Sequence, residues 1–149
     1  MLGHLTETEI EAVLQTNVIG RIGCYGGNRV YVVPVTYVYQ NGYIMGHTGE
    51  GMKVEYLRSN PNCCFEVDHM ENMANWQSVI AWGTFEELQG EAAQGVMLLL
   101  MQKLMPLITS QTSMPSHGVQ QTHRADTHGI KAVVYRIKLH EKTGRFEKR

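Results

Sequence analysis

The chain has 149 residues, of which 43% are hydrophobic and 18% charged, and its formal net charge is −1. This length suits a single domain over residues 1–149, and the composition argues against intrinsic disorder. The balanced charge argues against nucleic-acid binding through a broad basic surface. The longest apolar run, 96–101, is far shorter than the roughly 18 residues that a membrane-spanning helix needs.

The cysteine content and the first residues of the chain bear on the cellular compartment of the protein. Three cysteines are an odd count, which suits a disulfide framework poorly, and the first ten residues contain no apolar block that would make a signal peptide. We therefore expect reduced thiols and a cytoplasmic protein. Free cysteines are commonly buried, so Cys24, Cys63 and Cys64 are expected to be core residues rather than nucleophiles.

The first predicted element is a helix over 7–15, within an N-terminal segment 1–17. Thr6 and Glu9 have the spacing of a capping box, in which each side chain accepts a hydrogen bond from the backbone of the other residue. Three apolar residues then recur on one helical face.

Strands dominate the glycine-rich part of the chain that follows. Asn41-Gly42 is typical of a type I′ hairpin turn between two strands. Pro34 cannot donate a hydrogen bond to a sheet, so we expect it at a bulge or where its strand leaves a neighbour. Gly83 is expected at a bulge or a close approach of two backbones. The predicted strands are 20–25, 30–39, 43–47, 63–67, 77–88 and 131–139.

The remaining segments read as helices and loops. A short helix is expected over 52–59 and a longer one over 91–105, whose nearly all-round apolar surface indicates burial in a core or an interface. Polar loops are expected at 68–75 and 106–129, and a polar tail at 140–149. The antiparallel hairpins and the absence of regular βαβ alternation predict a mainly β (α+β) fold. We expect a six-stranded antiparallel barrel, closed or partly closed, with helices on its rim.

The segment from His47 to Lys53 is a candidate binding site. Two strands end there and a helix begins, and backbone amides at a helix start favour an anion. Gly49 and Gly51 let a backbone approach a ligand closely, while Thr48 adds a hydroxyl and Lys53 a positive charge. Two interpretations remain open on spacing alone: a phosphate cradle, or a capped surface helix with a solvated lysine.

Five segments in a fixed order resemble the pyridoxamine 5′-phosphate oxidase-like family of FMN-binding split β-barrels. The resemblance is nearest to the branch of nitroimidazole-resistance and related flavin-nucleotide-binding proteins. It covers most of 5–90 and resumes over 131–145. The segments that carry it are 33–37, 41–48, 51–53, 58–68 and 78–83.

The resemblance implies a homodimer with two FMN sites at the subunit interface. One strand would lie along the flavin ring, mainly through backbone groups that tune its electron affinity. A lysine would hold the phosphate, and polar residues would reach the flavin across the dimer. The matching positions are Val33, Pro34, Val35 and Thr36 beside the ring, His47 and Thr48 at the next strand end, Met52 and Lys53 beside the phosphate, and Gln77 and Ser78 across the dimer.

The sequence departs from the true oxidases of the family at two places. Met52 stands where they place an arginine, and the segment 136–138 lacks the histidine of their substrate-binding Arg-x-His motif. Oxidation of vitamin B6 is therefore not expected. Glu50 would repel a phosphate if it pointed inward, so its side chain is expected to point to solvent.

The resemblance implies an FMN-dependent oxidoreductase that reduces a small electrophile such as a nitro-aromatic or a quinone. His47 is a candidate proton donor, with a purely hydrogen-bonding histidine as the equal alternative. The alternative functions are a non-catalytic flavin-nucleotide-binding or sensing protein, and a haem or deazaflavin binder on the same fold. No metal site is expected from the spacing of His117, His123 and His128, and Trp76 and Trp82 are expected inside the barrel.

Overall fold

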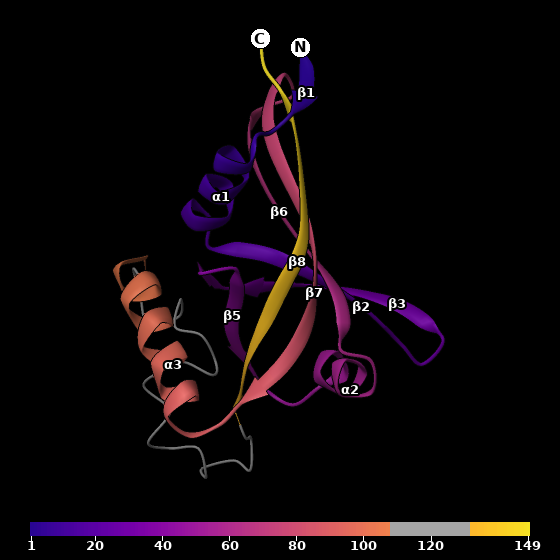
Figure 1. Cartoon of the computed structure of the whole chain (residues 1–149), viewed down its shortest axis with the longest axis vertical. Helices are drawn as coiled ribbons and strands as arrows, with labels where there is room; N and C mark the ends of the chain where they lie inside the picture. The colour runs from indigo at the N-terminus through magenta and orange to yellow at the C-terminus, as the bar shows by residue number, and fades with distance from the viewer. Residues whose placement is uncertain (108–131) are drawn as a thin grey trace.

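The computed structural model describes residues 1–107 and 132–149. The loop predicted at 106–129, with its three histidines, lies outside the described residues except for 106 and 107. Figure 1 shows a long twisted antiparallel sheet with helices packed around it. The elements are β1 (Leu2–His4), α1 (Glu7–Thr16), β2 (Ile19–Gly26), β3 (Arg29–Thr36), β4 (Val38–Gln40), β5 (Tyr43–Thr48), α2 (Met52–Ser59), β6 (Asn62–Asn72), β7 (Asn75–Leu88), α3 (Gly90–Leu104), the 3₁₀ turn η1 (Met105–Leu107) and β8 (Val133–Glu147).

The sheet curls so that its two ends meet at one residue. The strand order is β3-β2-β6-β7-β8-β5-β4, with β1 paired to β8. The end strands β3 and β4 are consecutive in the chain and are separated only by Tyr37. The Tyr37 backbone N–H donates to Val18 O at 3.1 Å, and its hydroxyl donates to Leu14 O at 2.7 Å. These two bonds fix the corner at which the strand changes its pairing partner.

The described residues contain eight strands, so the prediction of six was wrong. The strand predicted over 30–39 divides at Tyr37, because its first part pairs with β2 and its second with β5. The segment 140–149 is not a tail, since β8 continues to Glu147 and pairs with both β7 and β1. The segment 68–75 is not a loop but the end of a β6–β7 hairpin. The far part of β6 is exposed on both faces, so the period-two pattern that marks a half-buried strand is missing there.

Several local predictions are confirmed. The capping box of α1 is complete, because Thr6 N donates to Glu9 Oε2 at 2.7 Å and Glu9 N donates to Thr6 Oγ1 at 3.3 Å. Asn41 and Gly42 have φ values of 53° and 80°, as a type I′ turn requires. The β7–β8 register shifts at Gly83, where an added Cβ would lie 2.5 Å from a carbonyl oxygen of β8.

Pro34 occupies neither of the places expected for it. The β2–β3 ladder is continuous through Pro34, which stands opposite Arg21 without a bulge. The strand tolerates proline because β3 lies at the end of the strand order and pairs only with β2. The missing N–H therefore costs the sheet little.

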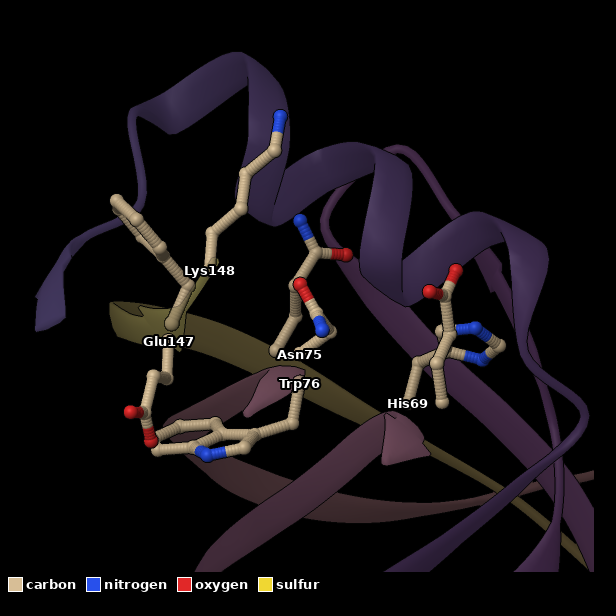
Figure 2. A pocket seen from close by; sticks show the side chains of 8 residues that line it. His69, Asn75, Trp76, Glu147 and Lys148 are labelled. Carbon is tan, nitrogen blue, oxygen red and sulfur yellow. The ribbon is translucent and has the colours of Figure 1, made fainter. Parts of the chain in front are cut away.

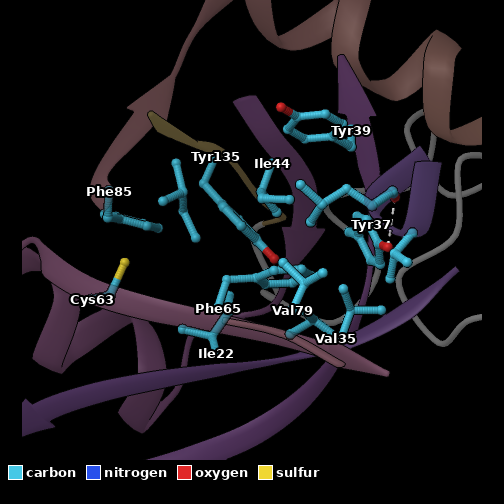
Figure 3. Close-up of a cluster of buried hydrophobic side chains, with 14 of the residues drawn as sticks. Ile22, Val35, Tyr37, Tyr39, Ile44, Cys63, Phe65, Val79, Phe85 and Tyr135 are labelled. Carbon is cyan, nitrogen blue, oxygen red and sulfur yellow. Dashed lines mark hydrogen bonds between the residues drawn. The ribbon is translucent and has the colours of Figure 1, made fainter. Parts of the chain in front are cut away.

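Apolar side chains fill the interior of the curled sheet (Figure 3). The Tyr37 and Phe65 rings meet edge to face with centroids 4.8 Å apart, and α1 adds Leu14 to the same cluster. Helix α3 packs separately over β4 and β5, where Leu100 is fully buried. None of the described helices is long and apolar enough to cross a membrane.

The hydroxyl of Tyr135 is buried in this core without a hydrogen-bond partner among the described residues. An added Cβ at Gly46 would lie 2.6 Å from Tyr135 Oη, so the glycine makes room for the hydroxyl. Burial raises the pKa of Tyr135 above its ordinary value. The phenol therefore stays neutral and unpaired, a state that costs free energy.

Replacement of Tyr135 by phenylalanine is expected to raise the free energy of unfolding by about 1 kcal/mol, because it removes an unsatisfied buried group. The matched control is Tyr37→Phe, which deletes the 2.7 Å bond to Leu14 O and should lower the free energy of unfolding by about 1 kcal/mol. Urea unfolding of the two variants measures both changes. A loss of stability in Tyr135→Phe would contradict the assignment of an unsatisfied hydroxyl.

Candidate functional site

Helix α2 begins directly after β5 and lies against the β2–β3 hairpin. The Tyr56 ring packs on Gly26 so closely that an added Cβ there would lie 2.4 Å from the ring. The same ring meets Tyr31 of β3 edge to face, with centroids 5.9 Å apart. The start of α2 is thereby held beside the first residues of β3.

Lys53, in the first turn of α2, is a half-buried cation. Burial lowers the pKa of Lys53 below its ordinary value. None of the ion pairs or hydrogen bonds found within residues 1–107 and 132–149 involves Lys53. The neighbouring Cys24 thiol supplies no charge at neutral pH, because burial raises the pKa of Cys24. A partly desolvated ammonium without a counter-ion is suited to an anionic ligand.

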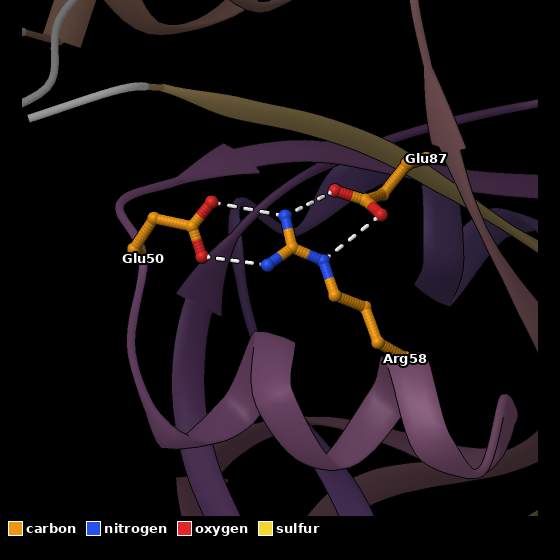
Figure 4. Close-up of polar contacts among 3 residues, drawn as sticks. All are labelled: Glu50, Arg58 and Glu87. Atoms are coloured by element: carbon orange, nitrogen blue, oxygen red, sulfur yellow. Dashed lines mark hydrogen bonds and ion pairs between the residues drawn. The ribbon is translucent and has the colours of Figure 1, made fainter.

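Two carboxylates are close to Lys53 in the chain. Glu55, two positions after it, forms none of the ion pairs found among the described residues, and Glu50, three positions before it, is engaged elsewhere. Arg58 Nη1 and Nη2 donate to the two Glu50 oxygens at 2.8 Å and 2.9 Å. Arg58 also donates to both oxygens of Glu87, as Figure 4 shows. The Glu50 side chain is about half exposed, at 48%, and is turned to Arg58, so it leaves the charge of Lys53 uncompensated.

β3 and the end of β5 do not pair with each other. The β4–β5 pairing stops at Val38–Met45, and continuing that register would place Thr36 opposite His47. Instead β3 departs at Tyr37 to pair with β2, while His47 and Thr48 remain paired with β8 on their other side. The two strands therefore diverge at the residues that the resemblance assigns to the flavin.

The divergence leaves one edge of β3 without a strand partner among the described residues. Val35 is buried and Val33 half-buried, with both side chains packed on the interior. Because Gly26 and Arg29 flank a two-residue turn, hydrogen-bonded pairs alternate from there, and the backbone groups of Val33 and Val35 point to β2. The backbone groups of Pro34 and Thr36 face the open edge. Such an edge offers N–H and C=O groups to a planar ligand in the way it would offer them to another strand.

Gln77 and Ser78 lie on β7 near the β6–β7 hairpin, opposite His69 and Asp68. In Figure 1 this hairpin and α2 are at opposite ends of the sheet. Gln77 lines an open hollow with a volume of about 230 Å³, together with Trp76 and the end of β8 (Figure 2). A single chain therefore does not bring Gln77 and Ser78 to Lys53.

The outward side of β3, β2, β6 and β7, which we call the outer face, is largely apolar. In β3, Val30 and Val32 are 72% and 64% exposed. One row across the strands runs from Val32 through Gly23 and Cys64 to Trp82. The next row contains Pro34, Arg21, Glu66 and Ile80, and Arg21 Nη1 lies 3.6 Å from Glu66 and 3.7 Å from Asp68.

Two sequence-based expectations fail on this part of the molecule. Trp82 is 39% exposed on the outer face and Trp76 lines the hollow, so neither ring fills the interior of the sheet. Cys64 is half-buried on the outer face, whereas Cys24 and Cys63 are buried core residues as expected. The difference arises because adjacent residues of a strand point to opposite faces of the sheet.

Sequence reasoning also missed Arg29 and the outer face. Arg29 lies beside α2, but its contacts are with residues more than 20 positions away in the chain, and no local pattern reveals them. The sequence did contain a signal for the outer face. In the run from Val30 to Val35, the residues that point inward and those that point outward are all apolar. A strand that is apolar on both faces is typically covered on both.

Comparisons with known proteins identify a matching family and similar folds. The sequence matches the family described as pyridoxamine 5′-phosphate oxidase over residues 6–146. An uncharacterized protein of Rhizobium meliloti is 26% identical over 91 residues, which span 61% of this chain and 59% of that protein. A FAD-binding protein of Mesorhizobium loti has a similar structure, with a TM-score of 0.77, 24% identity and 99% coverage of each chain. The FAD binding protein of Mycobacterium smegmatis gives a TM-score of 0.63 at 22% identity, with 99% of this chain and 100% of that chain covered.

Proposed function

The chain belongs to the pyridoxamine 5′-phosphate oxidase family, and on this premise we propose that it is a flavoprotein that binds FMN between two copies of the chain. The observation that carries the proposal is Lys53, a half-buried cation without a counter-ion among the described residues. It stands at the start of a helix that follows the end of β5, where β5 diverges from the open edge of β3.

The geometry suits the two chemical ends of FMN. A phosphate dianion would neutralise Lys53 and meet the backbone N–H groups at the start of α2. The open edge of β3 from Val33 to Thr36 would hold the ring through backbone groups, and His47 and Thr48 would border it from β5. The names of the Mesorhizobium and Mycobacterium proteins support a flavin nucleotide. Among the flavin nucleotides we propose FMN, because its single phosphate matches a site made of one lysine and one helix start.

The outer face supports a homodimer. Its exposed valines, Ile80 and Trp82 are contiguous across paired strands, and contiguous apolar patches of this kind mark interaction surfaces. A second copy of the chain fits best, because Gln77 and Ser78 can join Lys53 only if they come from another subunit. Two symmetric sites would then be shared by the two chains.

We propose that the bound flavin passes electrons to a small electrophile such as a nitro-aromatic or a quinone, chemistry that the cofactor itself supplies. The protein would position the ring along β3, and His47 would donate a proton or a hydrogen bond beside it. The segment 136–138 places Arg136 in an ion pair with Glu86 at 3.0 Å and lacks the histidine expected of a vitamin B6 oxidase. That chemistry is therefore not proposed.

Titration of the purified protein with FMN tests the proposal. We expect quenching of flavin fluorescence that saturates at one FMN per chain, and a yellow protein. Steady-state oxidation of NAD(P)H with nitro-aromatic and quinone acceptors then separates the oxidoreductase from a flavin-binding protein without turnover. A protein that leaves FMN fluorescence unchanged would contradict flavin binding.

The lowered pKa of Lys53 predicts how FMN affinity changes with pH. Because burial favours the neutral amine, Lys53 should lose its charge at a lower pH than the ordinary lysine value of about 10.4. FMN affinity should therefore fall as pH rises, beginning below that value. Arginine keeps its charge throughout, so Lys53→Arg should bind FMN without this alkaline loss. Identical pH profiles for the two proteins, measured by fluorescence titration, would show that Lys53 does not bind the phosphate.

A further inference from the structure

Arg29 is a second cation at the start of α2. Its Nε donates to Tyr56 Oη at 3.2 Å, and its Nη2 lies 4.0 Å from Met52 Sδ. Both contacts are with the same side of α2, one helical turn apart. The guanidinium of Arg29 therefore lies against the side chain of Met52, although the two residues are 23 positions apart in the chain.

No carboxylate among the described residues pairs with Arg29. The ion pairs found in residues 1–107 and 132–149 involve other cations, and Glu50 is committed to Arg58. On Tyr56, the group that accepts from Arg29 Nε is a hydroxyl and not a carboxylate. Arg29 thus contacts Met52, and Lys53 follows Met52 in α2, and neither cation forms an ion pair in the part of the chain that the structure describes.

We propose that Arg29, from the β2–β3 hairpin, supplies the second positive charge for the flavin phosphate, at the place where residue 52 of α2 is methionine. Tyr56 orients the guanidinium through the bond to Nε. This leaves for the ligand Nη1 and also Nη2, whose contact with Met52 Sδ at 4.0 Å is with a weak acceptor that a phosphate oxygen can replace. Arginine suits this task because its planar group donates two parallel bonds to a phosphate. This inference rests on the proposed function, which it deepens by assigning a binding residue from another element.

The arrangement also makes a prediction about ligand choice. A phosphate dianion would gain from both charges, whereas riboflavin, which has no phosphate, would gain from neither. Arg29 should therefore discriminate between FMN and riboflavin without contributing to binding of the ring. The same residue should contribute little to folding, because its side chain is exposed and its partners within residues 1–107 and 132–149 are one hydroxyl and one thioether sulfur.

The test measures dissociation constants of FMN and riboflavin for the wild type, Arg29→Gln and the double variant Arg29→Gln/Met52→Arg. Loss of one charged phosphate contact should raise the Kd for FMN about ten-fold in Arg29→Gln and leave the Kd for riboflavin unchanged. An arginine at position 52 should restore most of the FMN affinity in the double variant, because it returns the charge to the same place. Arg136→Gln, which removes an equal charge from β8, is the matched control and should bind both ligands as the wild type does.

Two results would overturn the role of Arg29 while leaving the proposed function standing. One is an FMN affinity of Arg29→Gln within two-fold of the wild type. The other is an equal loss of affinity for FMN and riboflavin, which would indicate a structural role. Failure of the wild type to bind FMN at all would instead contradict the proposed function, and with it this inference.

Discussion

Replacement of Lys53 by methionine is expected to weaken FMN binding about 30- to 150-fold, because a hydrogen bond to a charged group contributes roughly 2 to 3 kcal/mol. The ammonium is half-buried and its pKa is lowered by burial, so it is unfavourable to the protein without a ligand. Methionine keeps the apolar stem of the side chain and removes the charge. The melting temperature of the ligand-free protein should therefore be unchanged or higher.

Lys138→Met is the matched control for this variant. Lys138 is an exposed lysine of β8, and its removal changes the net charge by the same amount. Fluorescence titration and thermal unfolding of both variants give the two readouts. Equal FMN affinity in the Lys53 variant and the control would remove the observation on which the phosphate site depends.

The second large effect is expected at the outer face. Replacing Ile80 by aspartate places a carboxylate next to Glu66, its partner in the β6–β7 register, in the middle of the proposed interface. Burying an unpaired charge costs several kcal/mol, so the dimer should dissociate more than about 100-fold more readily. FMN binding should be lost together with the dimer, because each site is proposed to need two chains.

The fold of the Ile80→Asp chain should survive, since Ile80 is 41% exposed in the single chain. Circular dichroism checks the fold, and sedimentation velocity measures the mass with and without FMN. Leu98→Asp is the control, because Leu98 of α3 is 54% exposed away from the outer face. A dimeric, FMN-binding Ile80→Asp protein would show that the outer face is not the interface.

The sequence predicted the elements whose signals are local. The capping box at Thr6, the Asn41-Gly42 turn and the short helix over 52–59 depend on residues a few positions apart, and all three are present. Gly83 was also placed correctly, because a glycine within a strand indicates a close approach even when its partner is unknown.

The missed elements depend on pairing between distant parts of the chain. β1 exists because Leu2 and its neighbours pair with the end of β8, 145 positions away. The corner at Tyr37 arises because β3 and β4 have different partners, which no local pattern reveals. The polar ends of β6, β7 and β8 support one another as a ribbon and carry little apolar periodicity.

The same difference between local and distant signals applies to the candidate site. Lys53 and the strand end at His47 were found from the sequence because a strand end, glycines and a helix start follow one another in the chain. Arg29 was not, because it reaches Met52 through a hairpin that the sequence does not place beside α2. The distance between Gln77 and Lys53 within one chain becomes apparent only when the direction of β7 is known.

Native mass spectrometry of the wild-type protein with FMN tests the central claim, that a flavin is held between two copies of this chain. We expect a complex of two chains and two FMN molecules, and we expect FMN to be released when the two chains separate. A single chain that retains FMN, or a pair of chains that takes up none, would contradict it.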